Sequence, residues 1–85
     1  MFVNMWYTYV LKCSDGKLYV GSSGDLQRRL KEHQAGLVHT TLRRLPVRLV
    51  YYEARTSKKK AQQRERYLKT GFGRGYLKKE LSTPQ

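Results

Sequence analysis

The sequence has little of what would make it a disulfide-linked, zinc-binding or membrane protein. It has one cysteine among 85 residues, so no disulfide can form within the chain. Two histidines beside that cysteine do not supply the four ligands of a usual structural zinc site. No apolar run approaches the roughly 20 residues that span a bilayer. Residues 1–4 also lack a basic segment followed by an apolar one. We therefore expect a cytoplasmic protein without a membrane partner.

Acidic residues are scarce as well. Six Asp and Glu stand against 18 Lys and Arg, which gives a formal net charge of +12 and a pI near 10.2. Such a charge on a small chain implies a polyanionic partner, and nucleic acid is favoured over a membrane surface. Small ribosomal proteins share this composition, so the charge indicates a class of partner and no reaction. A ribosome-associated basic protein is therefore one hypothesis.

The chain length allows one modest core. A chain of 85 residues buries only about 60–65% of the surface that it exposes when unfolded. Seven Tyr, two Phe and one Trp can fill such a core, which argues against a disordered basic tail. We expect residues 1–85 to form a single domain.

Two segments rich in aromatic and β-branched residues predict a β-hairpin near the start of the chain. The strands are expected at residues 6–13 and 17–21, with residues 14–16 as the turn. A three-residue loop puts Tyr9 and Tyr19 on one face of the sheet as diagonal neighbours. A two-residue Asp-Gly turn would put them on opposite faces. We favour the three-residue loop.

The rest of the chain predicts three helices and one further strand. The expected elements are a helix at 26–34, capped by Ser23 or Asp25 and ended near Gly36, a basic loop at 37–45 closed by Pro46, a strand at 47–53, a helix at 58–69 capped by Ser57, and a short helix at 75–81. The order β-β-α-β-α-α is typical of a small α/β or α+β domain. Cys13 at the end of the first strand is expected to be a small buried hydrophobe without a catalytic role.

Two polar residues lie unusually close to the apolar stripe of the first helix. Leu26 and Leu30 define that stripe, and at 100° per residue His33 falls about 40° and Arg29 about 80° from its centre. The two residues are one turn apart. Arg29 along the helix edge with a hydrogen-bonded core histidine is one interpretation. A functional pair is the other, and both stay open.

The second helix carries a carboxylate on its apolar side. Glu65 lies between Ala61 and Leu68, about 50° from their mean direction. The other acids have ordinary positions in a turn, at a helix start or on exposed helical faces, and Glu53 is expected at a strand end. A buried carboxylate is costly unless it is paired or binds a metal. A salt bridge and a metal site are therefore both open for Glu65.

Together these residues suit metal-assisted hydrolysis of a phosphodiester. A base or proton shuttle, a cation for the phosphate oxygens and a hard carboxylate are the groups that this reaction needs. Mg²⁺ is often held by only one or two carboxylates, while waters and phosphate complete its shell. Glu65 alone would then be enough.

The same residues resemble the signature of the GIY-YIG nucleases. Residues 7–9 (Tyr-Thr-Tyr) and 19–21 (Tyr-Val-Gly) are similar to the two signature tripeptides, residues 19–33 to the strand, turn and helix of the family, and residues 64–69 to the helix with its metal-binding glutamate. The resemblance covers nearly the whole chain and is closest to the small stand-alone members. Tyr7 and Thr8 replace the name-giving glycine and isoleucine, while the tyrosine of the motif is kept.

The resemblance implies a fold and an activity. The fold would be a three-stranded, mainly antiparallel sheet flanked by helices. The activity would be that of an Mg²⁺- or Mn²⁺-dependent endonuclease that hydrolyses DNA in repair or processing. By position in the motifs, Tyr9 would be the general base, Tyr19 a hydrogen-bonding partner in the site, Arg29 the phosphate-stabilising cation, His33 a proton shuttle and Glu65 the metal ligand. A free tyrosine has a pKa of about 10, and we expect the cationic site and the metal, with help from Lys17, to lower that of Tyr9.

Basic residues outside this site predict a nucleic-acid-binding surface. The residues assigned to it are Lys17, Arg28, His39, Arg43, Arg44 and Arg74. Lysines 58–60 fit a solvated helix face better. Nothing resembles a base-reading module, so we expect binding led by the backbone that weakens steeply with salt. Duplex, branched and single-stranded DNA stay open as substrates, and RNA is not excluded.

A non-catalytic nucleic-acid-binding module that retains the nuclease fold is the alternative to an active enzyme. The intact set of catalytic residues favours the enzyme. The ribosomal hypothesis makes no use of Glu65 on an apolar helix face or of two tyrosines that share a sheet face.

Overall fold

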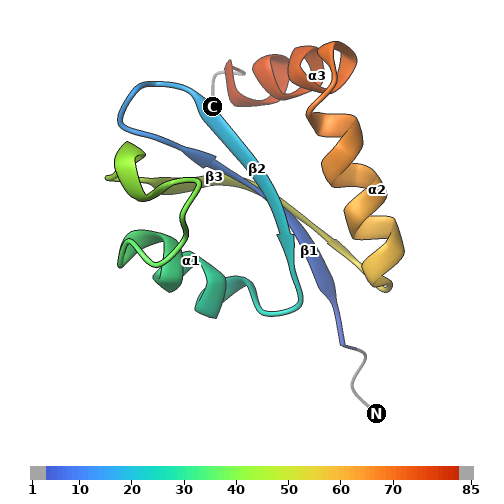
Figure 1. The fold of residues 1–85 in the computed structure, drawn as a ribbon. Coiled ribbons are helices and arrows are strands. Elements are labelled where there is room, and N and C mark those ends of the chain that lie inside the picture. The colour runs from blue at the N-terminus through green and yellow to red at the C-terminus, as the bar shows by residue number, and fades with distance from the viewer. Residues whose placement is uncertain (1–3, 83–85) are drawn as a thin grey trace.

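The computed structural model describes residues 4–82, which form a three-stranded sheet and three helices (Figure 1). The elements in chain order are β1 (Trp6–Lys12), β2 (Leu18–Ser23), α1 (Leu26–Gln34), a 3₁₀ turn η1 (Leu42–Arg44), β3 (Arg48–Arg55), α2 (Lys58–Leu68) and α3 (Gly71–Ser82). The strand order is β2-β1-β3 and both pairings are antiparallel. The predicted class and order are confirmed. Residues 1–3, part of the segment used for the expectation about targeting, lie outside the described residues.

The hairpin has the register that the three-residue loop predicts. Gly16 has a φ of 80°, the left-handed conformation that glycine adopts without a steric penalty. The Cys13 N–H donates to the Lys17 carbonyl at 2.9 Å, which closes the turn. Tyr9 therefore pairs with Gly21 across the strands. Paired residues share a face, so Tyr9 and Tyr19 project from the same side of the sheet.

The two faces of the sheet have separate cores. Figure 1 shows α1 on one side of the sheet and both α2 and α3 on the other. The core under α1 contains Tyr9, Leu11, Cys13 and Val47, with Leu26 and Leu30 packed against it. The core under α2 and α3 contains Val10, Val20, Leu68 and Leu77. Cys13 is buried, as expected.

α1 and α2 begin at predicted caps. The Asp25 carboxylate accepts a hydrogen bond from the Arg28 N–H at the start of α1, and the Ser57 hydroxyl accepts one from the Lys60 N–H at the start of α2. Gly36, with a φ of 78°, follows the end of α1. Within residues 4–82 no helix is long and apolar enough to cross a bilayer.

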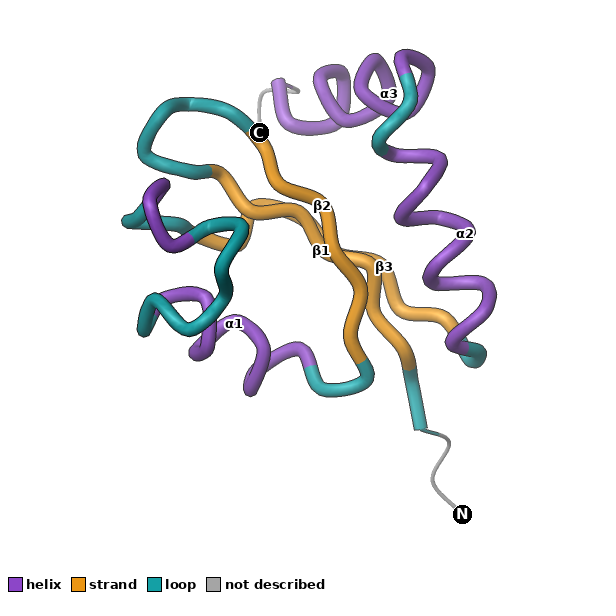
Figure 2. Tube along the Cα trace, in the orientation of Figure 1, coloured by secondary structure: helices purple, strands orange, loops and turns teal. Residues whose placement is uncertain are grey.

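β3 lies slightly further along the chain than expected. It begins at Arg48 and continues to Arg55, because its last two residues pair with Tyr7 and Trp6 of β1. The segment before it is also less irregular than expected, since it contains η1. Figure 2 shows this segment at the same end of the sheet as the hairpin loop, and the Ser14 N–H donates to the Arg44 carbonyl at 2.9 Å.

α3 begins four residues before the predicted start, within a glycine-rich segment. The Thr70 hydroxyl accepts a hydrogen bond from the Gly73 N–H at 3.2 Å. A Cβ atom at Gly73 would clash with the Tyr67 carbonyl and with Leu68 Cα. Close packing of α3 on the end of α2 therefore requires glycine here and outweighs its low helix propensity.

Candidate active site

A line of hydrogen bonds runs from Tyr9 through His33 to Thr41. Tyr9 Oη lies 2.8 Å from His33 Nε2, and His33 Nδ1 lies 2.8 Å from Thr41 Oγ1. All three side chains are buried. The Thr41 hydroxyl donates a long hydrogen bond, 3.5 Å, to the Val38 carbonyl, which can only accept. This assigns the proton of His33 to Nδ1 and makes Nε2 the acceptor of the Tyr9 hydroxyl.

Burial keeps both ends of the Tyr9–His33 hydrogen bond uncharged. Burial first, and then the Arg29 guanidinium, lower the pKa of His33, so the imidazole is neutral at pH 7. Burial also raises the pKa of Tyr9 to about 12, although Arg29 opposes the rise. Without a metal ion, the pKa of Tyr9 is therefore raised and not lowered, because lost hydration outweighs the nearby Arg29 cation. The expected lowering with a bound metal stays a prediction.

Tyr19 and Gly21 shape the surroundings of the Tyr9 hydroxyl. The Tyr19 ring centroid is 6.4 Å from that of Tyr9 and 5.2 Å from that of His33. A Cβ atom at Gly21 would lie 2.6 Å from Tyr9 Oη. The glycine therefore leaves room for the hydroxyl beside β2, which is an edge strand. The predicted register of the hairpin, which sets Gly21 opposite Tyr9, is the sequence signal that could have indicated this role of Gly21.

Arg29 lies at the exposed margin of this cluster. Its side chain is 37% exposed, and its Nη1 is 3.1 Å from Glu32 Oε1. Its charge acts on both Tyr9 and His33. The two interpretations of the helix pair therefore combine: Arg29 follows the helix edge and His33 is a hydrogen-bonded core residue, but their common neighbour is the predicted catalytic tyrosine.

Glu65 approaches the same sheet edge from the opposite face. The Ser22 hydroxyl donates to Glu65 Oε1 at 2.7 Å, and Lys69 Nζ lies 2.8 Å from Oε2. Ser22 faces α2 because it follows Gly21, which faces α1. The Glu65 charge reaches Tyr9 and contributes to the raised pKa of its hydroxyl. Of the two interpretations left open for Glu65, the salt bridge is present, with Lys69 as its partner. Sequence reasoning missed the supporting partners Ser22 and Lys69.

The donor set at Glu65 fits a hard divalent cation with a single protein carboxylate. Within residues 4–82 no three His, Cys, Asp or Glu side chains gather as a metal-binding group. The Glu65 carboxylate with the neighbouring Ser22 hydroxyl offers oxygen donors of the kind that Mg²⁺ and Mn²⁺ prefer. Lys69 holds one of these oxygens, so a metal ion would have to displace its ammonium group.

Glu53 is the carboxylate whose surroundings sequence reasoning described wrongly. Its side chain is 9% exposed, against 22% for Glu65, so Glu65 is not alone in facing a core. Arg64 Nε lies 2.9 and 3.1 Å from its two oxygens, Arg55 Nη2 lies 2.8 Å from one, and the Tyr51 hydroxyl donates to it. Burial opposes its ionisation, but hydrogen bonds from Arg64 and Tyr51 hold its pKa below the ordinary value. Because β3 continues to Arg55, Glu53 lies within the strand.

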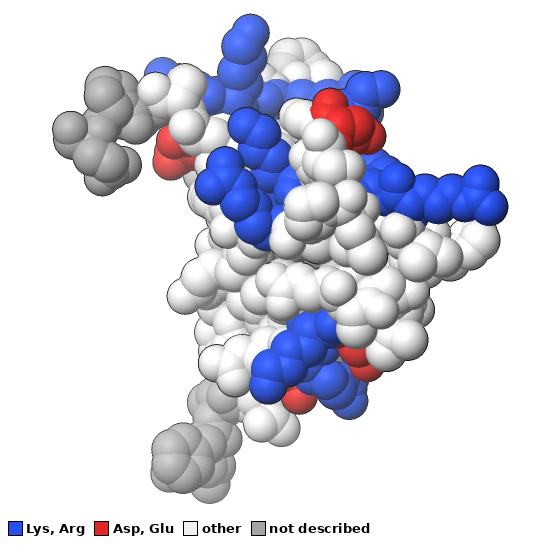
Figure 3. All heavy atoms as spheres, turned by 90° about the vertical axis from the view of Figure 1, so that its left-hand side faces the viewer, with Lys and Arg blue, Asp and Glu red and all other residues white. Residues whose placement is uncertain are grey.

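The structure brings together three of the six residues predicted to bind nucleic acid. Lys17, Arg44 and Arg74 line one hollow at the hairpin turn. Arg28, His39 and Arg43 are exposed and do not line it. Figure 3 shows a large group of Lys and Arg at the height of the hairpin and η1, and a smaller group at the height of α1. A band of other residues separates the two groups.

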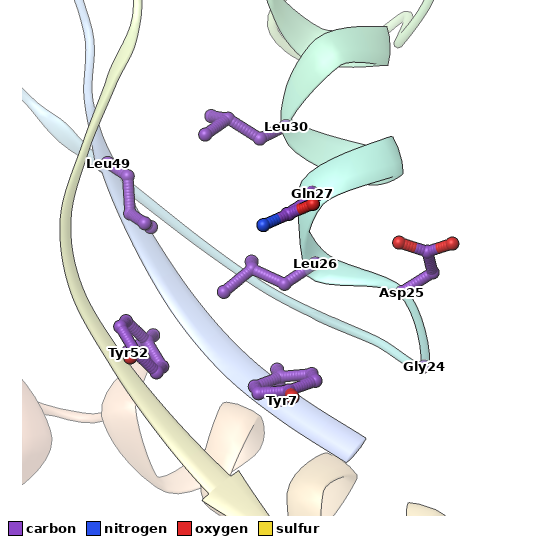
Figure 4. Close-up of a pocket in the computed structure, with 8 residues that line it drawn as sticks. All are labelled: Tyr7, Gly24, Asp25, Leu26, Gln27, Leu30, Leu49 and Tyr52. Atoms are coloured by element: carbon purple, nitrogen blue, oxygen red, sulfur yellow. The ribbon is translucent and has the colours of Figure 1, made fainter. Parts of the chain in front are cut away.

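A different hollow lies between α1 and β3 and contains none of the predicted site residues (Figure 4). Its lining residues are Tyr7, Gly24, Asp25, Leu26, Gln27, Leu30, Leu49 and Tyr52. The Tyr7 and Tyr52 rings meet edge to face with centroids 6.1 Å apart. In Figure 4 the Asp25 carboxylate points away from the hollow, while the Gln27 amide is turned toward it. The hollow therefore has a mixed polar and apolar lining, and none of the residues proposed for catalysis faces it.

Comparison with known proteins places this arrangement in a family context. Residues 5–79 match the family model described as the GIY-YIG catalytic domain. A UPF0213 protein of Streptococcus sanguinis is 49% identical over 67 residues, which are 78% of this chain and 77% of that protein. One of Bacillus pumilus is 48% identical over 65 residues, 75% of this chain and 66% of that protein. The solution NMR structure of a UPF0213 protein of Bacillus halodurans is similar with a TM-score of 0.58 and 34% identity, covering 94% of this chain and 88% of that one.

Proposed function

The chain belongs to the GIY-YIG family, and from this premise we propose that it is a divalent-metal-dependent endonuclease that hydrolyses DNA phosphodiester bonds. The observation that carries the proposal is the hydrogen bond from Tyr9 to a neutral, buried His33. This hydrogen bond joins the Tyr9 hydroxyl, which faces β2, to His33 Nε2, which can accept its proton. Arg29 and Glu65 flank the same edge.

Tyr9 and His33 would move the proton of the attacking water. In the resting protein the proton is on Tyr9, whose pKa is about 12, and His33 Nε2 is free of a proton. The Tyr9 oxygen can accept a proton from water only as its own proton passes to Nε2. Thr41 binds the other ring nitrogen and keeps Nε2 aimed at Tyr9. Thr41 is thus a positioning residue.

Arg29 would bind the scissile phosphate beside this pair. Its partly exposed ion pair with Glu32 is of the weak surface kind, so a phosphate can replace the carboxylate. A bound phosphate would offset the Arg29 charge that now lowers the pKa of His33. His33 would then accept the Tyr9 proton more readily than it does in the free protein.

Glu65 would hold the metal ion, with Ser22 orienting its carboxylate. When bound, the ion would act as a Lewis acid on the phosphate and stabilise the charge that develops on its oxygens. Lys69 would release Glu65 Oε2 and stay beside the phosphate as a further cation.

A specific observation also supports the second candidate, a binding module without turnover. The Tyr9 hydroxyl is protonated, and both Glu65 oxygens already have protein partners. This arrangement is also the one expected of a protein that retains the nuclease fold and binds nucleic acid without cutting it.

Cleavage of labelled nucleic acids separates the two candidates. The panel contains duplex, flap, branched and single-stranded DNA and an RNA, each with Mg²⁺, Mn²⁺ or EDTA. We expect metal-dependent cuts that fall by about 10²–10⁴-fold in Tyr9→Phe, because a positioned general base contributes that much. Glu65→Ala should abolish the cuts while DNA binding persists.

Two matched variants serve as controls. Tyr52→Phe removes the hydroxyl of the residue that pairs with Tyr9 on β3 and is 54% exposed, and Glu80→Ala removes an exposed carboxylate of α3. Both should cut like the wild type. Equal cleavage by the wild type and Glu65→Ala would reveal a contaminating nuclease or a wrong site. Salt-sensitive binding with no cut on any substrate would establish the binding module.

A further inference from the structure

We propose that a nucleic-acid strand crosses the protein along the outer edge of β2, from Glu65 to the hairpin turn, with Arg74 as its central phosphate-binding residue. The proposal rests on the proposed function, because it extends the same site along the bound strand. We call this surface the edge track. The residues of the track used in the argument are Lys17, Leu18, Tyr19, Arg44, Lys69 and Arg74.

Two adjoining hollows form the edge track. Tyr19 and Lys69 line the first, which lies toward Glu65. Lys17 and Arg44 line the second, which lies at the hairpin turn. Leu18 and Arg74 line both hollows, so the two surfaces are continuous at these residues. A third hollow, which includes Lys12, Arg48 and Lys78, also shares Arg74.

The first hollow begins at the catalytic groups. Lys69 Nζ is 2.8 Å from the Glu65 carboxylate, which reaches the β2 edge from the α2 side. The Tyr19 ring lies against His33, with centroids 5.2 Å apart, on the α1 side. A strand whose phosphate lies between these groups therefore has a direct path into the track.

The charges along the track suit a polyanion. Of the cations that line it, Arg44 pairs with Asp15 at 3.1 Å and Lys69 with Glu65 at 2.8 Å. Arg74 has no ion pair and no side-chain hydrogen bond within residues 4–82. Its guanidinium can therefore bind a phosphate without giving up a protein partner, and its planar fork matches two phosphate oxygens.

The glycines of α3 explain why Arg74 is accessible. Gly73 packs against the end of α2 and fixes the first turn of α3 on that helix. Gly75, on the other side of Arg74, has open space around it. The backbone contact at Gly73 thus holds the first turn of α3 in place. The two residues next to Arg74 in the sequence are glycines, so neither has a side chain that could cover the arginine.

The length of β2 sets the length of strand that the track can hold. Ser22 binds Glu65, and Leu18 borders both hollows. These residues are four positions apart, which at about 3.3 Å per residue is about 13 Å. One nucleotide of a duplex strand occupies about 3.4 Å along the helix axis. The track therefore accommodates about four nucleotides on one side of the scissile phosphate.

Binding measurements on an inactive protein test the track directly. Fluorescence anisotropy would follow labelled oligonucleotides of about 4 to 16 nucleotides, single-stranded and duplex, bound to Glu65→Ala in EDTA between about 50 and 200 mM salt. Adding Arg74→Gln should weaken binding about tenfold, as expected for one charged hydrogen-bonding contact. It should also reduce the slope of log K against log salt by about 0.7–0.9, the loss of one phosphate contact.

Arg66→Gln in the same background is the matched control. Arg66 is an exposed arginine of α2 outside the track, so its loss changes the net charge equally. It should leave the slope unchanged. Equal effects of Arg66→Gln and Arg74→Gln on either form of nucleic acid would mean diffuse attraction and would overturn the proposal. A larger Arg74 effect on single strands or on duplexes would identify the form that occupies the track.

Cleavage assays keep this test distinct from that of the proposed function. With an active background, Arg74→Gln should raise KM and change kcat little, and the effect should disappear when one side of the substrate is cut back to fewer than about four nucleotides. An unchanged KM on long substrates would overturn the track while leaving the nuclease intact. An Arg74-dependent salt slope without any cleavage by the wild type would support the track and count against the enzyme.

Discussion

The two faces of the sheet hold their polar groups by opposite means. On the α1 face, Tyr9, His33 and Thr41 form a buried line of neutral hydrogen bonds. On the α2 and α3 face, Glu53 and Arg64 are the centre of a charged network. The Arg64 guanidinium lies 5.0 Å from the ring centroids of Tyr67 and of Tyr76, and Tyr51 joins Glu53 to Tyr76.

The difference suits the roles proposed for the two faces. A neutral line can pass a proton along its hydrogen bonds without a permanent charge in the core, which would be costly there. A charged network holds a helix firmly because the loss of either partner leaves an uncompensated charge. Arg64 directly precedes Glu65, so the network fixes the turn of α2 that presents the proposed metal ligand. We infer that one face is arranged for proton chemistry and the other for position.

The largest effect is expected from breaking the charged network. Glu53→Ala leaves Arg64 and Arg55 without their shared carboxylate and should lower the free energy of unfolding by about 3 kcal/mol. Glu53→Gln retains hydrogen bonding and should lower it by less. Urea denaturation measures both, with Glu80→Ala as a surface control expected within about 0.5 kcal/mol of the wild type. A Glu53→Ala protein as stable as the control would show that the network contributes nothing.

A smaller effect is expected from breaking the neutral line at Thr41. Thr41→Val retains the shape but leaves the buried Nδ1–H of His33 without its acceptor, which should cost about 1–2 kcal/mol. Thr41→Ser restores the hydroxyl and should recover most of the loss. If Thr41 positions the imidazole, the valine variant should also lower kcat with little change in KM and shift the pH–rate profile. A loss of stability with an unchanged pH–rate profile would leave Thr41 a merely structural role.

The smallest effect is a difference in how the two faces respond to acid. The pKa of folded His33 is lowered from the unfolded value of about 6.5, so the unfolded chain binds more protons below that pH and stability falls. The slope for one proton is at most about 1.4 kcal/mol per pH unit. Glu53, whose pKa is also lowered, loses its contribution only below about pH 4.3.

Thermal unfolding between pH 7 and pH 3 resolves these two steps. His33→Gln should flatten the stability curve in the upper range, and Glu53→Gln should flatten it in the lower range. The exposed His39, replaced by Gln, is the control for the upper step. If the stability curve flattens equally in the His39 variant, the upper step does not belong specifically to His33.

The sequence predicted the elements and the faces on which the candidate site residues lie, because local rules determine both. The three-residue turn at Gly16 set the register of the hairpin, and the register put Tyr9 and Tyr19 on one face. Helical periodicity predicted that His33 and Glu65 lie on the inward faces of their helices. Each of these inferences needed only spacing within one element or across one tight turn.

The partners of those residues could not be predicted because they come from distant segments. Thr41 lies in a loop whose path depends on the packing of its flanking elements, and nothing in its neighbourhood distinguishes it from Thr40. The environment of Glu53 depends on Arg64 of another element and on β3 extending to Arg55. The early start of α3 depends on the close approach of Gly73 to α2. Tertiary packing overrides local propensity at each of these positions.

The position of the candidate site beside an edge strand also bears on how copies of the protein behave in solution. Within residues 4–82 no strand pairs with the outer side of β2. Such an open edge is a template for a strand of another molecule, and charged residues are a common protection. Copies that approach edge to edge would bring together two cationic edges, each with Lys17 and Arg74 at its hairpin end. The positive charge that would attract a polyanion thus also opposes self-association through the β2 edge. A bound polyanion would neutralise that charge, but it would itself cover the edge and so still block pairing.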